Sequence, residues 1–127
     1  YEWKLIESTL EKIKSADIKQ IDIVGPVPNW LPTLKRNLIN YLRFNNIEGE
    51  LPKRLDSVID HRASAIDKEM EVFFEKQKVN YISPWKIFCN DQGCLTYIDS
   101  GIESMVTFDY GHLTTKASKY LVSRFSD

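Results

Sequence analysis

The chain has 127 residues, of which 43% are hydrophobic and 28% are charged, and its formal net charge at pH 7 is −1. This length predicts one domain with its own hydrophobic core. The balanced charge argues against a nucleic-acid-binding protein and a polybasic membrane patch, and no apolar run approaches the ~18 residues of a membrane span.

The first half of the chain alternates between helical and strand patterns. Residues 2–16 carry apolar side chains at helical spacing, and residues 21–24 form a short apolar run that stops at the rigid loop 25–28, Gly-Pro-Val-Pro. Two more helices are expected, from Leu31 to Asn45-Asn46 and from about Leu55 to Lys76. Helix, strand and loop in this order predict an α/β fold with a parallel sheet. Residues 1–127 are expected to form a single domain.

The second half continues this pattern with shorter elements. Residues 79–83 alternate as a strand that Pro84 stops, and residues 95–98 are a second short strand. Residues 99–101, Asp-Ser-Gly, have the composition of a turn. The last helix is expected to begin at Thr114 or Thr115.

The two cysteines, Cys89 and Cys94, bracket the turn-forming loop Asn-Asp-Gln-Gly. Two cysteines without nearby histidines do not make a structural zinc site, and the redox spacing Cys-x-x-Cys is absent. A small-loop disulfide in an oxidising compartment and two buried thiols in a cytosolic protein both remain open at this point.

The segment most suggestive of chemistry is Asp109-Tyr110-Gly111-His112. Gly111 permits a tight turn, so the Asp109 carboxylate can accept a hydrogen bond from one imidazole nitrogen of His112 while the other nitrogen acts as a general base. The segment follows the β-branched, apolar run 105–108 and precedes a helix, which predicts a strand-to-helix loop of the kind that carries function in α/β proteins. His61, the other histidine, falls within a predicted helix and is expected to be structural.

A nucleophile for this acid–base pair is harder to find. The sequence has no Gly-x-Ser-x-Gly and no Gly-Asp-Ser block. Ser100 comes nearest, but it lies in a predicted turn rather than at a helix start, where backbone N–H groups stabilise an oxyanion, so we do not expect it to be the nucleophile. No Gly-rich phosphate loop or metal-ligand cluster appears, and we expect no cofactor and no metal.

The order of these features resembles a known family. A strand ending in a Gly-Pro-x-Pro loop, a helical insertion, a cysteine pair and an Asp-x-x-His-Leu-Ser/Thr before the final helix occur in the C-terminal part of the SGNH-type hydrolase domain attached to membrane-bound acyltransferases. These enzymes O-acylate bacterial cell-surface sugars. The resemblance spans about Trp3 to Phe125. It implies a three-layer α/β/α, flavodoxin-like SGNH hydrolase fold that lacks its N-terminal strand or strands.

The resemblance also implies roles for individual residues. Asp109 would orient His112, and His112 would be the general base, while the serine and the oxyanion donors would come from an upstream segment. Asn29 is a weaker candidate for lining the site, because a helix N-cap is its simpler role. Since the family's domain faces the periplasm, the resemblance favours a disulfide between Cys89 and Cys94.

The predicted function is therefore that of part of an acyltransferase, with acetyl the expected group and a surface carbohydrate the acceptor. Because the sequence begins at Tyr1, we expect a processed chain or a piece of a longer protein. The expected partner is a membrane-embedded acyltransferase domain upstream in the parent chain, at the periplasmic face of the bacterial inner membrane. Without its serine, this chain alone is expected to be inactive.

Three alternatives remain on sequence grounds. The chain could be a fragment of an SGNH esterase or deacetylase, with water as the acceptor. It could instead be a non-catalytic carbohydrate-binding or scaffold domain that presents Trp30, Trp85 and Tyr110 as stacking surfaces. The third alternative is an α/β domain in which the Asp–His turn is structural.

Overall fold

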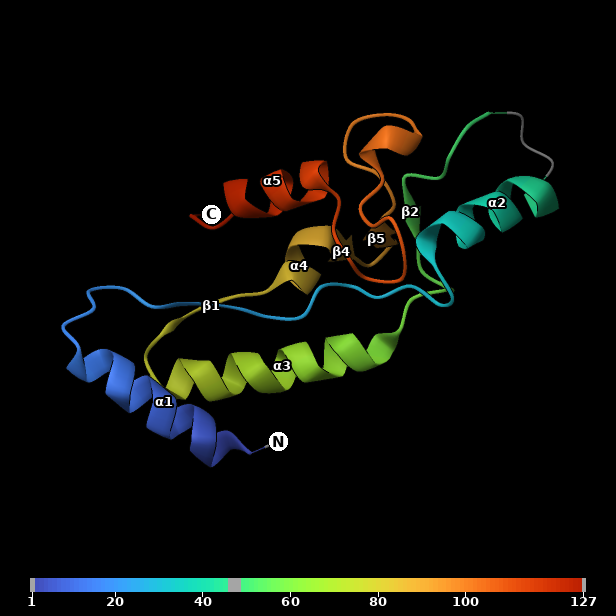
Figure 1. Cartoon of the computed structure of the whole chain (residues 1–127). Helices are drawn as coiled ribbons and strands as arrows, with labels where there is room; N and C mark the ends of the chain where they lie inside the picture. The colour runs from blue at the N-terminus through green and yellow to red at the C-terminus, as the bar shows by residue number, and fades with distance from the viewer. Residues whose placement is uncertain (1, 46–48, 127) are drawn as a thin grey trace.

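The computed structural model describes residues 2–45 and 49–126. The elements in chain order are α1 (Trp3–Ser15), β1 (Asp22–Val24), α2 (Leu34–Asn45), β2 (Arg54–Leu55), α3 (His61–Lys76), β3 (Asn80–Ile82), α4 (Pro84–Phe88), β4 (Cys89–Asn90), β5 (Gly93–Leu95), the 3₁₀ turn η1 (Ile102–Ser104) and α5 (Thr115–Ser123). Figure 1 shows α3 along one side of β1, with α4 and α5 on the other. The predicted α/β fold is confirmed.

The centre of the fold is a parallel pair of strands. β1 and β3 pair in register, from Asp22 opposite Asn80 to Val24 opposite Ile82. A parallel pair requires a long crossover, and here α2 and α3 lie within it. Both strands therefore end at the same edge, where β1 continues into the loop 25–28.

Helix α3 is joined to β3 by a buried polar cluster. Asp67 is 2% exposed, and its carboxylate accepts hydrogen bonds from the hydroxyls of Tyr81 (2.8 Å) and Ser83 (2.7 Å). Burial, together with the neighbouring carboxylate of Asp67, raises the pKa of the Tyr81 phenol. A Cβ on Gly25 would lie 2.0 Å from the Tyr81 oxygen, so the start of the 25–28 loop packs directly on this cluster.

A second, antiparallel sheet has the strand order β2-β5-β4. Its β4–β5 hairpin places Cys89 opposite Cys94, and the two form a disulfide. Gly93 has φ +108°, and a Cβ there would lie 2.4 Å from the Leu55 carbonyl oxygen, so this close approach of β5 to β2 requires glycine.

The hydrophobic core lies between α2, α4, α5 and the antiparallel sheet. Its buried members are Trp30, Leu34, Leu38, Ile59, Phe88, Cys94, Leu95, Met105, Val106, Ala117 and Leu121. Helices α1 and α3 make a separate contact, in which the rings of Trp3 and Phe73 stack with centroids 4.4 Å apart. The core therefore joins α2 to the C-terminal half of the chain.

Two predicted helix starts were wrong. Helix α3 begins at His61 rather than near Leu55, because Arg54 and Leu55 pair with β5 as strand β2. The Asp60 side chain accepts a hydrogen bond from the Arg62 N–H (3.0 Å) and caps the helix.

Helix α2 begins at Leu34 rather than at Leu31. The Thr33 hydroxyl accepts a hydrogen bond from the Arg36 N–H (3.3 Å) and so caps its first turn. The predicted end at Asn45 is confirmed, whereas Asn46 lies outside the described residues.

The remaining predictions differ from the structure by small amounts. Helix α1 and strands β1 and β3 lie within the expected ranges, and α5 begins at Thr115 as predicted. The strand expected at 95–98 is instead β5, which ends at Leu95, while Tyr97 forms an isolated bridge with Met105. Helix α4 was not predicted, although Ser83 as its N-cap and Pro84 at its first position are the usual start signals.

Candidate active site

Asp109 and His112 lie in contact in a turn just before α5. One oxygen of Asp109, Oδ1, accepts hydrogen bonds from the Gly111 N–H (2.9 Å) and the His112 N–H (2.8 Å). The other oxygen, Oδ2, lies 2.6 Å from Nδ1 of His112. Aspartate readily bonds to backbone N–H groups two and three residues ahead, so the local sequence alone favours this turn.

The turn leads directly into α5. The Thr114 hydroxyl accepts a hydrogen bond from the Ala117 N–H (3.2 Å) and caps the helix. Thr114 also donates its hydroxyl to the Met105 carbonyl (2.6 Å). The segment before the turn forms isolated bridges rather than the expected strand, one of which joins Thr107 to Leu113. The turn is therefore held at both ends, by the bridge between Thr107 and Leu113 and by the hydrogen bonds of Thr114.

The His112 ring is oriented by the carboxylate and open on its other side. Because a carboxylate only accepts, the Nδ1 that faces Asp109 carries the proton, which leaves the Nε2 lone pair available. Nε2 has no hydrogen-bond partner among residues 2–45 and 49–126, and the His112 side chain is 64% exposed. Phe108 stacks on the ring with centroids 5.8 Å apart, and Tyr110 meets it edge-on at 5.5 Å.

The Asp109 carboxyl is held in its charged form. Its pKa is lowered to about 2, chiefly by the hydrogen bond from the His112 backbone N–H and in addition by the Gly111 N–H and the imidazole. At neutral pH Asp109 is thus a carboxylate, and it faces only one of the two ring nitrogens of His112. This arrangement suits a general base whose protonated form is stabilised by a neighbouring negative charge.

A distant segment of the chain holds this turn in place. The Trp30 N–H donates to the Tyr110 carbonyl (2.6 Å), and the Leu34 N–H donates to the Asp109 carbonyl (3.2 Å). The end of the 25–28 loop and the start of α2 are therefore clamped to the turn by the main chain.

Asn29 lies against the same turn. A Cβ on Gly111 would lie 2.2 Å from the Asn29 side-chain oxygen, and Gly111 is not among the glycines with positive φ. Gly111 is therefore required for the close approach of Asn29 rather than for a left-handed turn. The helix N-cap role expected for Asn29 is wrong, because α2 starts at Leu34 and Thr33 caps it. No sequence pattern signalled the Asn29–Gly111 contact, which joins residues far apart in the chain.

The other candidate residues do not join this site. Ser100 is exposed in a bend, where its carbonyl accepts a bond from Ser104 (3.0 Å), and within the described residues its hydroxyl makes no hydrogen bond to His112. His61 is the exposed first residue of α3, with its ring centroid 6.1 Å from that of Trp85. Trp30 is fully buried, so it cannot stack on a sugar as one alternative required.

Neither a metal site nor a membrane-spanning helix is found in the described part of the chain. Within residues 2–45 and 49–126, no three histidine, cysteine, aspartate or glutamate side chains are grouped so as to hold a metal ion. Over the same described ranges, every helix is too short or too polar to cross a membrane.

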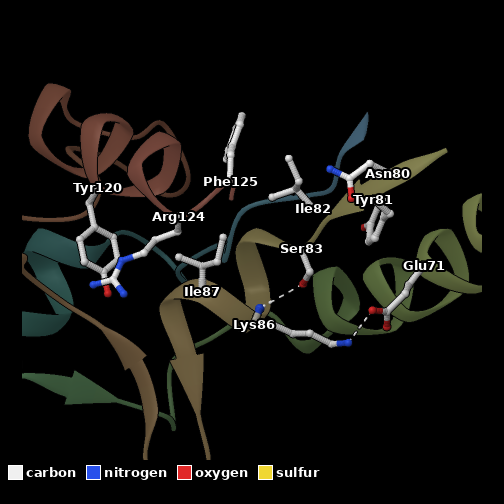
Figure 2. A pocket seen from close by; sticks show the side chains of 10 residues that line it. All are labelled: Glu71, Asn80, Tyr81, Ile82, Ser83, Lys86, Ile87, Tyr120, Arg124 and Phe125. Carbon is white, nitrogen blue, oxygen red and sulfur yellow. Dashed lines mark hydrogen bonds and ion pairs between the residues drawn. The ribbon is translucent and has the colours of Figure 1, made fainter. Parts of the chain in front are cut away.

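A hollow of the surface lies elsewhere, between β3, α4 and α5, with a volume of about 340 Å³. Figure 2 shows Ser83 and Lys86 on its lower side and Tyr120 and Arg124 on the α5 side. Lys86 is paired there with Glu71 at 2.5 Å. No residue of the 109–112 turn lines it, so this hollow is separate from the Asp–His pair.

Comparison with known proteins agrees with this architecture. Residues 2–127 match the family model described as the SGNH domain fused to AT3 domains. A search of the curated proteins gave no match. Among solved structures, the chain is similar to the periplasmic domain of the lipopolysaccharide acetyltransferase of Salmonella ser. Paratyphi A, with 30% identity and a TM-score of 0.83 over 95% of this chain and 46% of that one. The chain thus spans under half of that domain, and it belongs to the family of SGNH domains fused to AT3 domains.

Proposed function

We propose that this chain supplies the acid–base half of a serine acyltransferase that acylates bacterial cell-surface carbohydrate, with acetyl as the expected group. The observation that carries the proposal is the contact between Asp109 Oδ2 and His112 Nδ1 at 2.6 Å, with the opposite nitrogen of the exposed ring free. The serine and oxyanion donors come from an upstream segment of the parent protein. The chain alone is then inactive.

The reaction follows from the free nitrogen of His112. In the first half, Nε2 takes the proton of the serine hydroxyl as the serine oxygen attacks the carbonyl carbon of the acyl donor. The donor's leaving group departs with that proton, and an acyl-serine ester remains. In the second half, Nε2 takes the proton of a sugar hydroxyl, whose oxygen attacks the ester, and the proton returns to the serine. Asp109 stabilises the imidazolium in both halves without being protonated.

The comparisons support the wider setting of this proposal. The family model describes SGNH domains that are fused to AT3 domains, which supports a membrane-embedded acyltransferase domain as the partner. The similar solved structure is a periplasmic domain of a lipopolysaccharide acetyltransferase, which supports a periplasmic location and a carbohydrate acceptor. Because this chain covers 46% of that domain, a serine-bearing segment has a natural place in the uncovered part.

The test is labelling of the full-length parent protein with a fluorophosphonate, followed by peptide mapping of the modified residue. We expect an adduct on a serine upstream of this chain, lost in His112→Ala and in Asp109→Asn. In Asp109→Asn the new amide would donate to Nδ1 and drive the imidazole proton onto Nε2, which removes the base. His61→Ala is the matched control, since it removes the other, exposed histidine. An adduct on Ser100, or full labelling of His112→Ala, would overturn the mechanism.

A further inference from the structure

A second hollow, which we call the α2 cleft, lies between α2 and residues 55–58, which begin at the last residue of β2. Its volume is about 280 Å³. The residues that line it are Asn37, Asn40, Tyr41, Phe44, Asn45, Leu55, Ser57 and Val58. None of these eight side chains is ionisable near neutral pH, and five of them carry an amide or a hydroxyl.

One polar group of the α2 cleft lacks a partner. Asn37 is 6% exposed, and its amide nitrogen forms no hydrogen bond within the described part of the chain. Buried polar groups in native proteins are nearly always paired, so an orphaned amide N–H in the wall of a cleft points to a ligand that accepts a hydrogen bond. The Asn45 amide nitrogen, in contrast, donates to the Tyr41 carbonyl at 2.9 Å, which leaves its oxygen for another partner.

The α2 cleft also offers aromatic surface. Phe44 is a large apolar side chain, yet it is 82% exposed. It lies about one helical turn from Tyr41 on α2. Aromatic faces beside neutral amides suit a ligand that has both C–H surfaces and hydroxyl groups. A phosphate or carboxylate ligand would need a cation in the wall, and none of the described residues that line the cleft supplies one.

The position of the cleft relates it to the Asp–His pair. The first residue of α2, Leu34, donates its N–H to the Asp109 carbonyl at 3.2 Å. At a helical rise of 1.5 Å per residue, Asn37 lies about 4.5 Å and Tyr41 about 10 Å along the helix from that contact. The first lining residue of the cleft on α2 is therefore less than one helical turn from the residue that contacts the Asp–His turn.

We infer that the α2 cleft binds the carbohydrate acceptor, as a neutral oligosaccharide whose hydroxyls pair with the asparagine amides and whose ring faces pack on Tyr41 and Phe44. This inference rests on the proposed function, because it assigns the acceptor of that reaction to a place on this domain. It adds a binding role for α2, which the acid–base chemistry does not use.

The test is calorimetric titration of the full-length parent protein with neutral oligosaccharides released by mild acid from the surface polysaccharide of its host bacterium. We expect the Kd to rise about tenfold in Tyr41→Ala, as for the loss of one stacked ring with its hydroxyl, and to rise in Phe44→Ala as well. Ile39→Ala is the matched control, because Ile39 is a 48% exposed apolar residue of α2 outside the cleft lining. Its Kd should equal that of the wild type.

The outcomes separate this inference from the proposed mechanism, because binding does not require the base and is also measured in His112→Ala. If labelling fails but binding depends on Tyr41 and Phe44, the cleft assignment stands and the transfer mechanism falls. If labelling succeeds but the wild type binds no oligosaccharide, or both cleft variants bind as the wild type does, the assignment is overturned. A large loss of stability in Phe44→Ala would also overturn it, since an 82% exposed ring can matter to stability only if another protein segment fills the cleft.

Discussion

Replacing Gly111 by alanine tests whether the close approach of Asn29 sets the geometry of the 109–112 turn, which we call the acid–base turn. A Cβ at position 111 would lie 2.2 Å from the Asn29 side-chain oxygen, whereas ordinary contacts begin at 3.4 Å. One of the two groups must therefore retreat by about 1.2 Å to restore normal van der Waals separation. The Gly111 backbone is outside the left-handed region, so alanine adds no backbone strain of its own.

The change should affect stability little and activity strongly. Since the opposing atom is at the end of a side chain, we expect Gly111→Ala to cost only about 1 kcal/mol of stability, the low end for overpacking. We expect the turn to move together with the Asn29 side chain, and a displacement of His112 by about 1 Å would lower the acyl-transfer rate roughly 10²-fold. The expected result is thus a large loss of kcat with a small change in Tm.

The assay is acyl transfer to the host polysaccharide by the full-length protein, measured alongside its thermal melting curve. Asn29→Ala is the control, and the double variant Asn29→Ala/Gly111→Ala removes both partners of the clash. We expect the double variant to recover most of the activity lost in Gly111→Ala, down to the level of Asn29→Ala. Wild-type activity in Gly111→Ala, or no recovery in the double variant, would refute the role assigned to this contact.

Three further predictions concern other parts of the structure. The pKa of Asp109 is lowered from 3.8 to about 2, so the stability that its carboxylate contributes should be fully present above about pH 4 and lost as the pH falls through 2. Carbon-detected NMR titration of the carboxyl measures this pKa, and a midpoint near 3.8 would contradict the prediction. Replacing Cys89 and Cys94 by serine should lower the free energy of unfolding by about 2 kcal/mol, the chain-entropy value for so short a loop. Thermal melting measures this, with the reduced wild type as the matched control, and equal melting temperatures of the serine variant and the oxidised wild type would contradict it. Gly25→Ala should destabilise the protein by about 1–3 kcal/mol in urea unfolding, because its Cβ would lie 2.0 Å from the Tyr81 oxygen and 2.7 Å from the ring carbon that carries it; an unchanged unfolding midpoint would contradict this.

The features that were predictable from sequence are those set by neighbours in the chain. The contact of Asp109 with His112 spans three residues and follows from the hydrogen bonds that aspartate makes to nearby backbone groups. The start of α5 at Thr115 was likewise marked by its own capping residue. Whether the pair is catalytic stays a prediction, because the contact alone would also suit a structural turn.

The features that could not be predicted depend on distant pairing. Leu55 was predicted to begin a helix, but it forms β2 with Arg54, because both residues pair with β5 some 40 residues later in the chain. Asn29 resembled a helix cap, yet it lies against Gly111. The cysteine spacing alone did not decide between a disulfide and two thiols. The family resemblance favoured the disulfide, and the structure contains it.

Two hydrogen bonds hold the acid–base turn against the segment before α2, and their chemistry determines which residues of the turn can be replaced. Both of its hydrogen bonds join main-chain atoms, from the N–H groups of Trp30 and Leu34 to the carbonyls of Tyr110 and Asp109. Every residue offers such a carbonyl, and every residue except proline offers such an N–H. The half-exposed side chain of Tyr110, which borders His112, can therefore vary widely while the turn keeps its geometry. Position 110 is accordingly a place where substrate preference can diversify, in nature or in a randomised library, without dismantling the acid–base pair.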